Sequence, residues 1–150
     1  IHGVGAVQNE LHKYTSGVVD LADYLPNLAR SVLTIERGED HILTTEAQSV
    51  KVSFQTASNL GLIVNELVIN AIKHGRVNRI ALTVRRPEPG VAEICIADQG
   101  PGFSEDELTS STPRGSAKGR ELVDALAHAC NATVIRRNLN GAQVCLRFPC

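Results

Sequence analysis

Aromatic residues are scarce in this 150-residue chain, at 3% of the sequence, and Trp and Met are both absent. A core must therefore be built from aliphatic side chains, and a hydrophobic content of 43% supplies enough of them for one domain. The lack of Met even at position 1 indicates a piece of a longer protein. No apolar run approaches the roughly 18 residues that cross a bilayer, and the first residues lack the features of a signal peptide.

Charge and cysteine are also sparse. A net charge of −1, with no basic stripe, argues against binding to nucleic acid or direct contact with a membrane. None of the four cysteines forms a CxxC pair, which disfavours zinc. Cys95 and Cys145 fall within apolar strand patterns, so we expect them to be small, reduced core residues. Reduced thiols in turn favour a cytoplasmic location.

The hydrophobic periodicity predicts an α+β protein. A weakly helical segment at 1–17 precedes Asp20, which is expected to cap a helix. Further along, the pattern predicts strands at 42–46, 50–54, 79–85, 91–98, 133–137 and 143–148, and helices from about Ser58 to His74 and from about Gly119 to Cys130. Because the strands come mostly as hairpins, we expect a two-layer α/β sandwich whose mixed, mostly antiparallel sheet is covered by helices on one face.

One face of the helix at 58–74 is polar. Glu66, Asn70, Lys73 and His74 share that face, together with Asn59. An amide oxygen can ligate Mg²⁺, an ammonium can neutralise phosphate, and a carboxylate can orient water or a proton. This line of groups suits a metal–polyphosphate, although a solvated face is the more common explanation of such a helix taken alone.

Two glycine-rich clusters follow the polar helix. Asp98-Gln99-Gly100-Pro101-Gly102-Phe103 ends a strand, where Asp98 can accept a hydrogen bond from an exocyclic amine such as that of adenine. A tight turn is the alternative interpretation. Residues 115–123 lead from small residues into a helix start, which suits either a phosphate site or a plain linker. Residues 99–118 are expected to form one long loop, and loops of this length are usually functional or mobile.

The order and spacing of these clusters resemble the N box, G1 box and G2 box of the GHKL ATPase superfamily. The N box is Asn65-Glu66-Leu67-Val68-Ile69-Asn70-Ala71-Ile72-Lys73-His74-Gly75. Its Lys-His ending is similar to sensor histidine kinases with a phosphoacceptor domain of the second type, close to the HWE kinases. The resemblance implies an ATP-binding catalytic domain at 18–150, preceded at 1–17 by the end of a dimerisation helix.

The resemblance also implies the chemistry of the site. Asn70 would hold Mg²⁺, and Glu66 and Lys73 would be catalytic, the first polarising the nucleophile and the second meeting phosphate. The ATP-binding residues would be Asn70, His74, Asp98, Gly100, Gly102, Phe103, Lys118 and Gly119. The reaction would be transfer of the γ-phosphoryl group to a histidine, and catalysis would rest on positioning and charge neutralisation.

The implied partners are a phosphoacceptor histidine domain of the same protein and the receiver domain of a response regulator. The full-length protein is expected to be a homodimer in the cytoplasm. No histidine of this chain has the setting of a phosphoacceptor, so the acceptor is expected outside it.

Two residues depart from the G2 pattern. Ala117 stands where the family has Gly, and Arg120 stands where it has Leu. Arg114, Lys118 and Arg120 are either phosphate ligands or simply exposed charges. An alternative function is therefore a histidine phosphotransferase or adaptor whose degenerate nucleotide domain binds no ATP. A serine kinase or ATPase of the same superfamily is a third hypothesis, and Lys73 argues against it.

Overall fold

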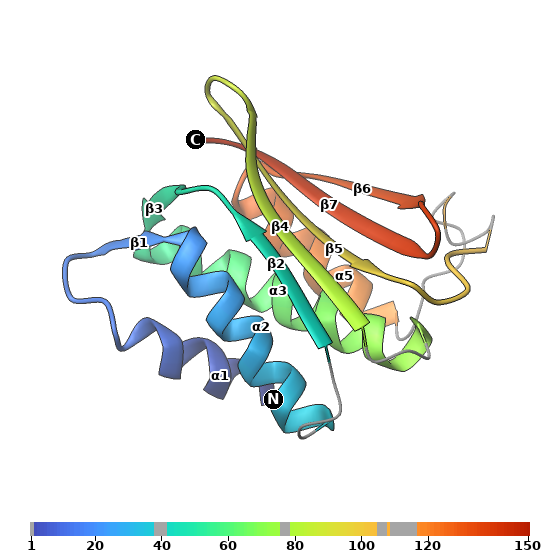
Figure 1. The fold of residues 1–150 in the computed structure, drawn as a ribbon. Helices are drawn as coiled ribbons and strands as arrows, with labels where there is room; N and C mark the ends of the chain where they lie inside the picture. Colours follow the sequence, from blue (N-terminus) through green and yellow to red (C-terminus); the bar gives the residue numbers. More distant parts are fainter. Residues whose placement is uncertain (1, 38–41, 76–78, 105–107, 109–116) are drawn as a thin grey trace.

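The computed structural model describes residues 2–37, 42–75, 79–104, 108 and 117–150 (Figure 1). Along the chain the elements are α1 (His2–Leu11), β1 (Val18–Asp20), α2 (Leu21–Arg37), β2 (Ile42–Ala47), β3 (Lys51–Ser53), α3 (Phe54–Gly75), β4 (Arg79–Glu88), β5 (Val91–Asp98), α5 (Ala117–Ala129), β6 (Thr133–Asn138) and β7 (Ala142–Pro149). No described helix is both long enough and apolar enough to span a bilayer.

Five strands form one mixed sheet in the order β2-β4-β5-β7-β6. Only β2 and β4 pair in parallel, and the other neighbours are antiparallel. Hairpin turns join β4 to β5 and β6 to β7, and the second turn has positive φ at Asn140 (59°) and Gly141 (137°). The strands β1 and β3 form a separate two-stranded sheet. The predicted mixed, mostly antiparallel sheet is confirmed.

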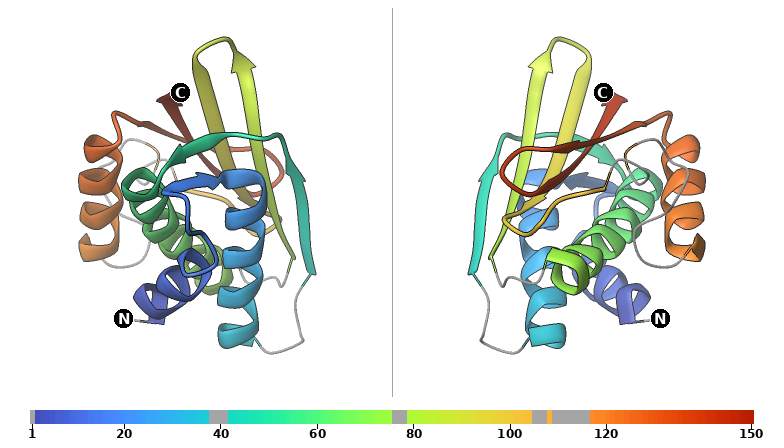
Figure 2. Two further views of the ribbon diagram at one scale, coloured as in Figure 1. Left: turned by 90° about the vertical axis from the view of Figure 1, so that its left-hand side faces the viewer. Right: turned by 90° about the vertical axis from the view of Figure 1, so that its right-hand side faces the viewer.

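The helices lie on one face of the five-stranded sheet, as the two side views show (Figure 2). Alternate residues of β4, namely Ile80, Leu82 and Val84, are buried at 0–1% exposure against this helical layer. The core contains no Trp or Met and is almost entirely aliphatic. Helix α1 joins it through Ala6, Val7 and Leu11. The predicted two-layer α+β architecture is therefore confirmed.

Helix α3 begins earlier than the sequence predicts. The hydrophobic pattern places Phe54 in a strand and the helix start near Ser58, but Phe54 is the first helical residue. The reason is an N-cap: the Oγ of Ser53 accepts a hydrogen bond from the backbone N–H of Thr56 at 3.2 Å. This cap satisfies a helix-terminal donor just after a strand of only three residues.

Asp20 caps α2, as predicted. Its Oδ1 accepts hydrogen bonds from the N–H groups of Ala22 (3.0 Å) and Val50 (3.2 Å), and its Oδ2 accepts one from the Ser49 hydroxyl (2.7 Å). One carboxylate therefore joins the start of α2 to the segment before β3. Burial opposes the charged form, but the hydrogen bonds outweigh burial and lower the pKa of Asp20 below its ordinary value of 3.8.

Replacing Asp20 with alanine should lower the free energy of unfolding by about 1–2 kcal/mol at pH 7. Because the folded pKa is lowered, this stabilisation is fully present above the unfolded pKa near 3.8 and is lost as pH falls through the folded value. Urea unfolding at pH 7 and at pH 3 should show that the difference in unfolding free energy between Asp20→Ala and wild type is smaller at pH 3. The control is Asp23→Ala, because Asp23 lies in the first turn of α2 and its side chain is exposed. An equal loss in both variants would contradict a capping role.

The prediction of reduced thiols is wrong for one pair of cysteines. Cys95 of β5 and Cys145 of β7 lie directly opposite each other, with Cα atoms 4.1 Å apart, and form a disulfide. Both are buried, as expected, at 6% and 1% exposure. They alternate with Ile94 and Ile96, however, so they lie on the face of the sheet away from the helices. Strand register brings them together, and the spacing in sequence gave no sign of it.

Candidate functional site

The polar face of α3 follows the prediction in its C-terminal half. The apolar side of the helix is buried, and it includes Ala57, Leu60, Ile63, Val64, Leu67, Val68, Ala71 and Ile72. On the other side, Glu66 and Asn70 are half-buried and Lys73 is exposed. The side chain of His74 lies outside the described residues. A carboxylate, an amide and an ammonium thus line the helix about one turn apart.

Asn59 does not share this location. It lies eleven residues before Asn70, a rise of about 16 Å along the helix. There its side chain forms a hydrogen bond with Cys130, whose thiol pKa is raised by burial and lowered in part by this bond. Asn59 therefore belongs to the packing between α3 and the end of α5.

Asp98 ends β5 and is 4% exposed. Its Oδ1 accepts hydrogen bonds from the N–H groups of Gly100 (2.8 Å) and Ala142 (3.3 Å). The carboxylate therefore fixes both the loop that follows it and the first residue of β7. Gly141 packs so closely that a Cβ there would collide with the Asp98 carbonyl oxygen. The two hydrogen bonds and the close packing of Gly141 hold the Asp98 carboxylate in one position.

Asn138 at the end of β6 holds the glycine-rich loop from the other side. Its Oδ1 accepts a hydrogen bond from the N–H of Phe103 at 2.7 Å, and its Nδ2 donates to the Phe103 carbonyl at 2.9 Å. Gly102 has φ +83°, and a Cβ there would lie 2.6 Å from Asn138 Oδ1. Gly102 is therefore required by its conformation and by space. No local sequence pattern indicated Asn138 beyond its closeness to a hairpin turn.

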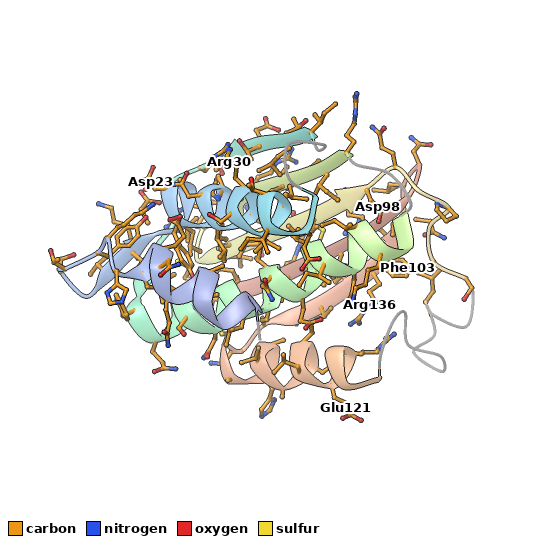
Figure 3. All side chains as sticks on the ribbon, turned by 90° about the horizontal axis from the view of Figure 1, so that it is seen from below. Asp23, Arg30, Asp98, Phe103, Glu121 and Arg136 are labelled. Carbon is orange, nitrogen blue, oxygen red and sulfur yellow. A yellow bond between two sulfur atoms is a disulfide. The ribbon has the colours of Figure 1, made fainter. Side chains whose placement is uncertain are left out.

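A cavity of about 30 Å³ lies where α3, the glycine-rich loop, α5 and the last two strands meet. Its polar walls are Asn70, Arg120 and Arg136. The other lining residues within the described part of the chain are apolar: Leu67, Phe103, Val123 and Val144. In Figure 3 the labelled Asp98, Phe103 and Arg136 lie at one end of the molecule, beside the C-terminal half of α3.

The cavity unites only part of the predicted set. Asn70 and Phe103 line it, whereas Glu66, Lys73 and Asp98 do not. Gly119 is buried in the first turn of α5. The side chain of Lys118 and most of the predicted loop, residues 105–107 and 109–116, lie outside the described residues. The G2-like segment is therefore described only from α5 onwards.

Arg136 is the lining residue that the sequence interpretation missed. Its strand position pairs with Val144, so its side chain points toward the helical layer and is 14% exposed. Its Nη2 lies 3.7 Å from Oδ1 of Asp124 on α5. Burial lowers the pKa of Arg136, and the nearby charge of Arg120 lowers it further. Alternation along β6 could have indicated an inward-facing arginine once the strand was assigned.

Comparison with known proteins agrees with the sequence resemblance. Residues 55–150 match the family described as histidine kinase-, DNA gyrase B-, and HSP90-like ATPase. Blue-light-activated histidine kinase 2 of Erythrobacter litoralis is 27% identical over 126 residues, covering 81% of this chain and 36% of that protein. The sensor-type histidine kinase PrrB of Mycobacterium tuberculosis is 29% identical over 143 residues, covering 87% of this chain and 31% of that protein. The chain thus spans about a third of these relatives.

Solved structures share the fold. The blue-light activated histidine kinase EL346 of Erythrobacter litoralis superposes with a TM-score of 0.80 at 23% identity, over 99% of this chain and 51% of that chain. The ATP binding domain of PrrB from Mycobacterium tuberculosis gives 0.73 at 27% identity, over 88% and 95%. The chain belongs to the family of histidine kinase-, DNA gyrase B- and HSP90-like ATPases, and the relatives named above are histidine kinases.

Proposed function

We propose that this chain is the Mg-ATP-binding catalytic domain of a two-component sensor histidine kinase. It transfers the γ-phosphoryl group of ATP to a histidine that lies outside the chain. The observation that carries the proposal is the cavity in which Asn70 of α3 meets the loop held by Asp98 and Asn138, with two arginines in its walls. The Asn70 amide, the two guanidinium groups and the Asp98 carboxylate lie at one end of the domain, which supports a site for Mg²⁺, phosphate and adenine.

The adenine end is assigned to the Asp98 corner. A carboxylate fixed by two backbone donors is preorganised to accept a hydrogen bond from the exocyclic amine of adenine. Gly100 would let a flat base approach the loop, because it has no side chain there. Gly102 would contribute its backbone only, because Asn138 fills the space beside its Cα. Phe103, at the end of this loop, supplies apolar surface to the cavity that Asn70 also lines.

The phosphate end is assigned to the polar face of α3. The amide of Asn70 is half-buried and faces a cavity whose other polar groups are cationic, which suits an oxygen ligand for Mg²⁺ bound together with phosphate. Bound there, Mg²⁺ would neutralise phosphate charge. Glu66, one turn before Asn70, would orient the incoming nucleophile, and the exposed Lys73 would meet the phosphates with His74, Lys118 and Gly119.

Partners and location follow from this assignment. The implied partners are a phosphoacceptor histidine domain of the same protein, which the segment 1–17 would join to the catalytic domain, and the receiver domain of a response regulator. The whole protein would be a homodimer. Because ATP is the substrate, the domain would act in the cytoplasm. A degenerate domain that binds no nucleotide is the weaker alternative, because the family match includes the N box, the G1 box and the G2-like segment.

Changing Asp98 to asparagine tests the adenine assignment. Adenine presents an amine at its 6-position and hypoxanthine presents a carbonyl, so a carboxylate should prefer ATP to ITP. Asp98→Asn introduces an amide that can also donate, and we expect ATP affinity to fall about 10-fold while the preference over ITP shrinks. Both constants are measured by competition against a fluorescent ATP analogue with Mg²⁺.

The control is Glu93→Gln on the same strand, which removes a carboxylate that pairs with Arg147 at 2.7 Å on the opposite face of the sheet. That variant should keep the wild-type preference for ATP. Wild-type protein that binds no nucleotide at millimolar concentration would overturn the proposed function and favour the adaptor alternative.

A further inference from the structure

The structure places two guanidinium groups at one small cavity. Arg120 is the fourth residue of α5, and Arg136 comes from β6. Both line the cavity that Asn70 also lines. No local sequence pattern links the two arginines, since packing of α5 over β6 brings them together. Two like charges in the wall of one cavity favour an anionic occupant.

The environment of Arg136 strengthens this preference. The side chain is only 14% exposed, and four of the seven cavity-lining residues that the structure describes are apolar. An anion in such surroundings interacts with a guanidinium more strongly than it does in bulk water. The carboxylate of Asp124 neutralises Arg136 only in part, because it lies 3.7 Å away and is itself 56% exposed.

We propose that Arg136 and Arg120 form a two-guanidinium site for the polyphosphate of the bound nucleotide, facing Asn70 across the cleft. This inference rests on the proposed function and adds Arg136 as a phosphate-binding residue. It also gives Arg120 a role at the position where the family's G2 box has Leu. The positive charges of Arg120 on α5 and Arg136 on β6 then add to the phosphate contacts that the G2 segment makes.

The cavity is much smaller than the ligand that we propose for it. A volume of about 30 Å³ holds roughly one water molecule, whereas a nucleoside triphosphate is many times larger. Binding therefore requires side chains at the rim to move apart. Arg136 belongs to a paired strand, whereas Arg120 stands near the start of α5, so we expect Arg120 to move onto the phosphates.

The test compares adenosine, ADP and ATP, each titrated with Mg²⁺ into the purified 150-residue chain by calorimetry. Arg136→Met keeps an unbranched apolar side chain beneath α5 but removes the guanidinium. We expect ATP affinity to fall about 10- to 100-fold and adenosine affinity to change less than twofold. Arg136→Lys keeps the positive charge but not the planar guanidinium group, so it should lose less ATP affinity than Arg136→Met.

The matched control is Arg137→Met. Arg137 follows directly on β6, is exposed, and points to the opposite face of the sheet. The Arg137→Met variant should bind adenosine, ADP and ATP with the same affinities as the wild-type chain. A double-mutant cycle of Arg136→Met with Arg120→Met should show losses that are not additive, because the two groups share one ligand.

A second measurement separates phosphate binding from a structural role. Asp124→Asn removes the carboxylate that partly neutralises Arg136, and it should strengthen ATP binding about two- to fivefold at low salt. An equal loss of adenosine and ATP affinity in Arg136→Met, or weaker ATP binding in Asp124→Asn, would overturn the inference while leaving the proposed function intact. Failure of the wild-type chain to bind ATP would instead overturn the proposed function.

Discussion

Replacing Asn70 with alanine should abolish the dependence of nucleotide binding on Mg²⁺. In the presence of Mg²⁺ we expect ATP affinity to fall about 10- to 100-fold, to the level that wild-type protein shows without metal. The physical reason is that Mg²⁺ keeps most of its ligands from water and phosphate, so loss of one protein oxygen removes much of the protein's hold on the metal. Titrations of a fluorescent ATP analogue with Mg²⁺ and with EDTA measure the effect.

The control is Asn59→Ala on the same helix. Asn59 is the same residue type, but it lies about 16 Å along α3 and its side chain contacts Cys130. This variant should retain full Mg²⁺ dependence. If Asn70→Ala kept its response to Mg²⁺, the metal assignment would be wrong even though nucleotide binding by the domain could still hold.

Replacing Gly141 with alanine should destabilise the chain by about 3 kcal/mol or more. Gly141 has φ +137°, where an L-residue is strained, and an added Cβ would meet the carbonyl oxygen of Asp98 and lie 2.9 Å from the Cα of Gln99. Relief of this contact requires the corner that holds Asp98 to move. Thermal melting should show a midpoint lowered by about 10 °C for a domain of this size.

Gly90→Ala is the matched control for Gly141→Ala. Gly90 lies in the other hairpin turn and also has positive φ, at +81°, but its added Cβ would have no neighbour within 4 Å. The Gly90→Ala variant should therefore lose only about 1–2 kcal/mol of unfolding free energy, which is the cost of placing an L-residue at positive φ. Similar losses at both glycines would mean that the collision with Asp98 contributes nothing.

The order of helices and strands could be predicted well from the sequence. Alternation in β4 and β5 and the apolar stripe of α3 repeat at two and 3.6 residues, so neighbouring residues carry the signal. The cap at Asp20 and the hairpin at Asn140-Gly141 are equally local. The start of α3 was predicted too late, because the strand pattern through Phe54 overrode the cap at Ser53.

The candidate site could be predicted only in part. Glu66, Asn70 and Asp98 were identified because they belong to compact motifs. Asn138 and Arg136 were missed, although one clamps the Phe103 backbone and the other lines the same cavity as Asn70. Each contacts residues far away in the chain, so strand alternation could have indicated only that Arg136 faces inward and could not have identified the partners of either residue.

By itself the sequence determined an aliphatic α+β domain with a polar α3 face followed by a carboxylate and two glycines. Only the tertiary structure decided the contacts between distant residues. It joined Cys95 to Cys145, Asp98 to Ala142, and Phe103 to Asn138, pairs separated by 50, 44 and 35 residues. The physical reason is that periodicity is a property of consecutive residues, whereas strand register is set by which faces the whole sheet buries.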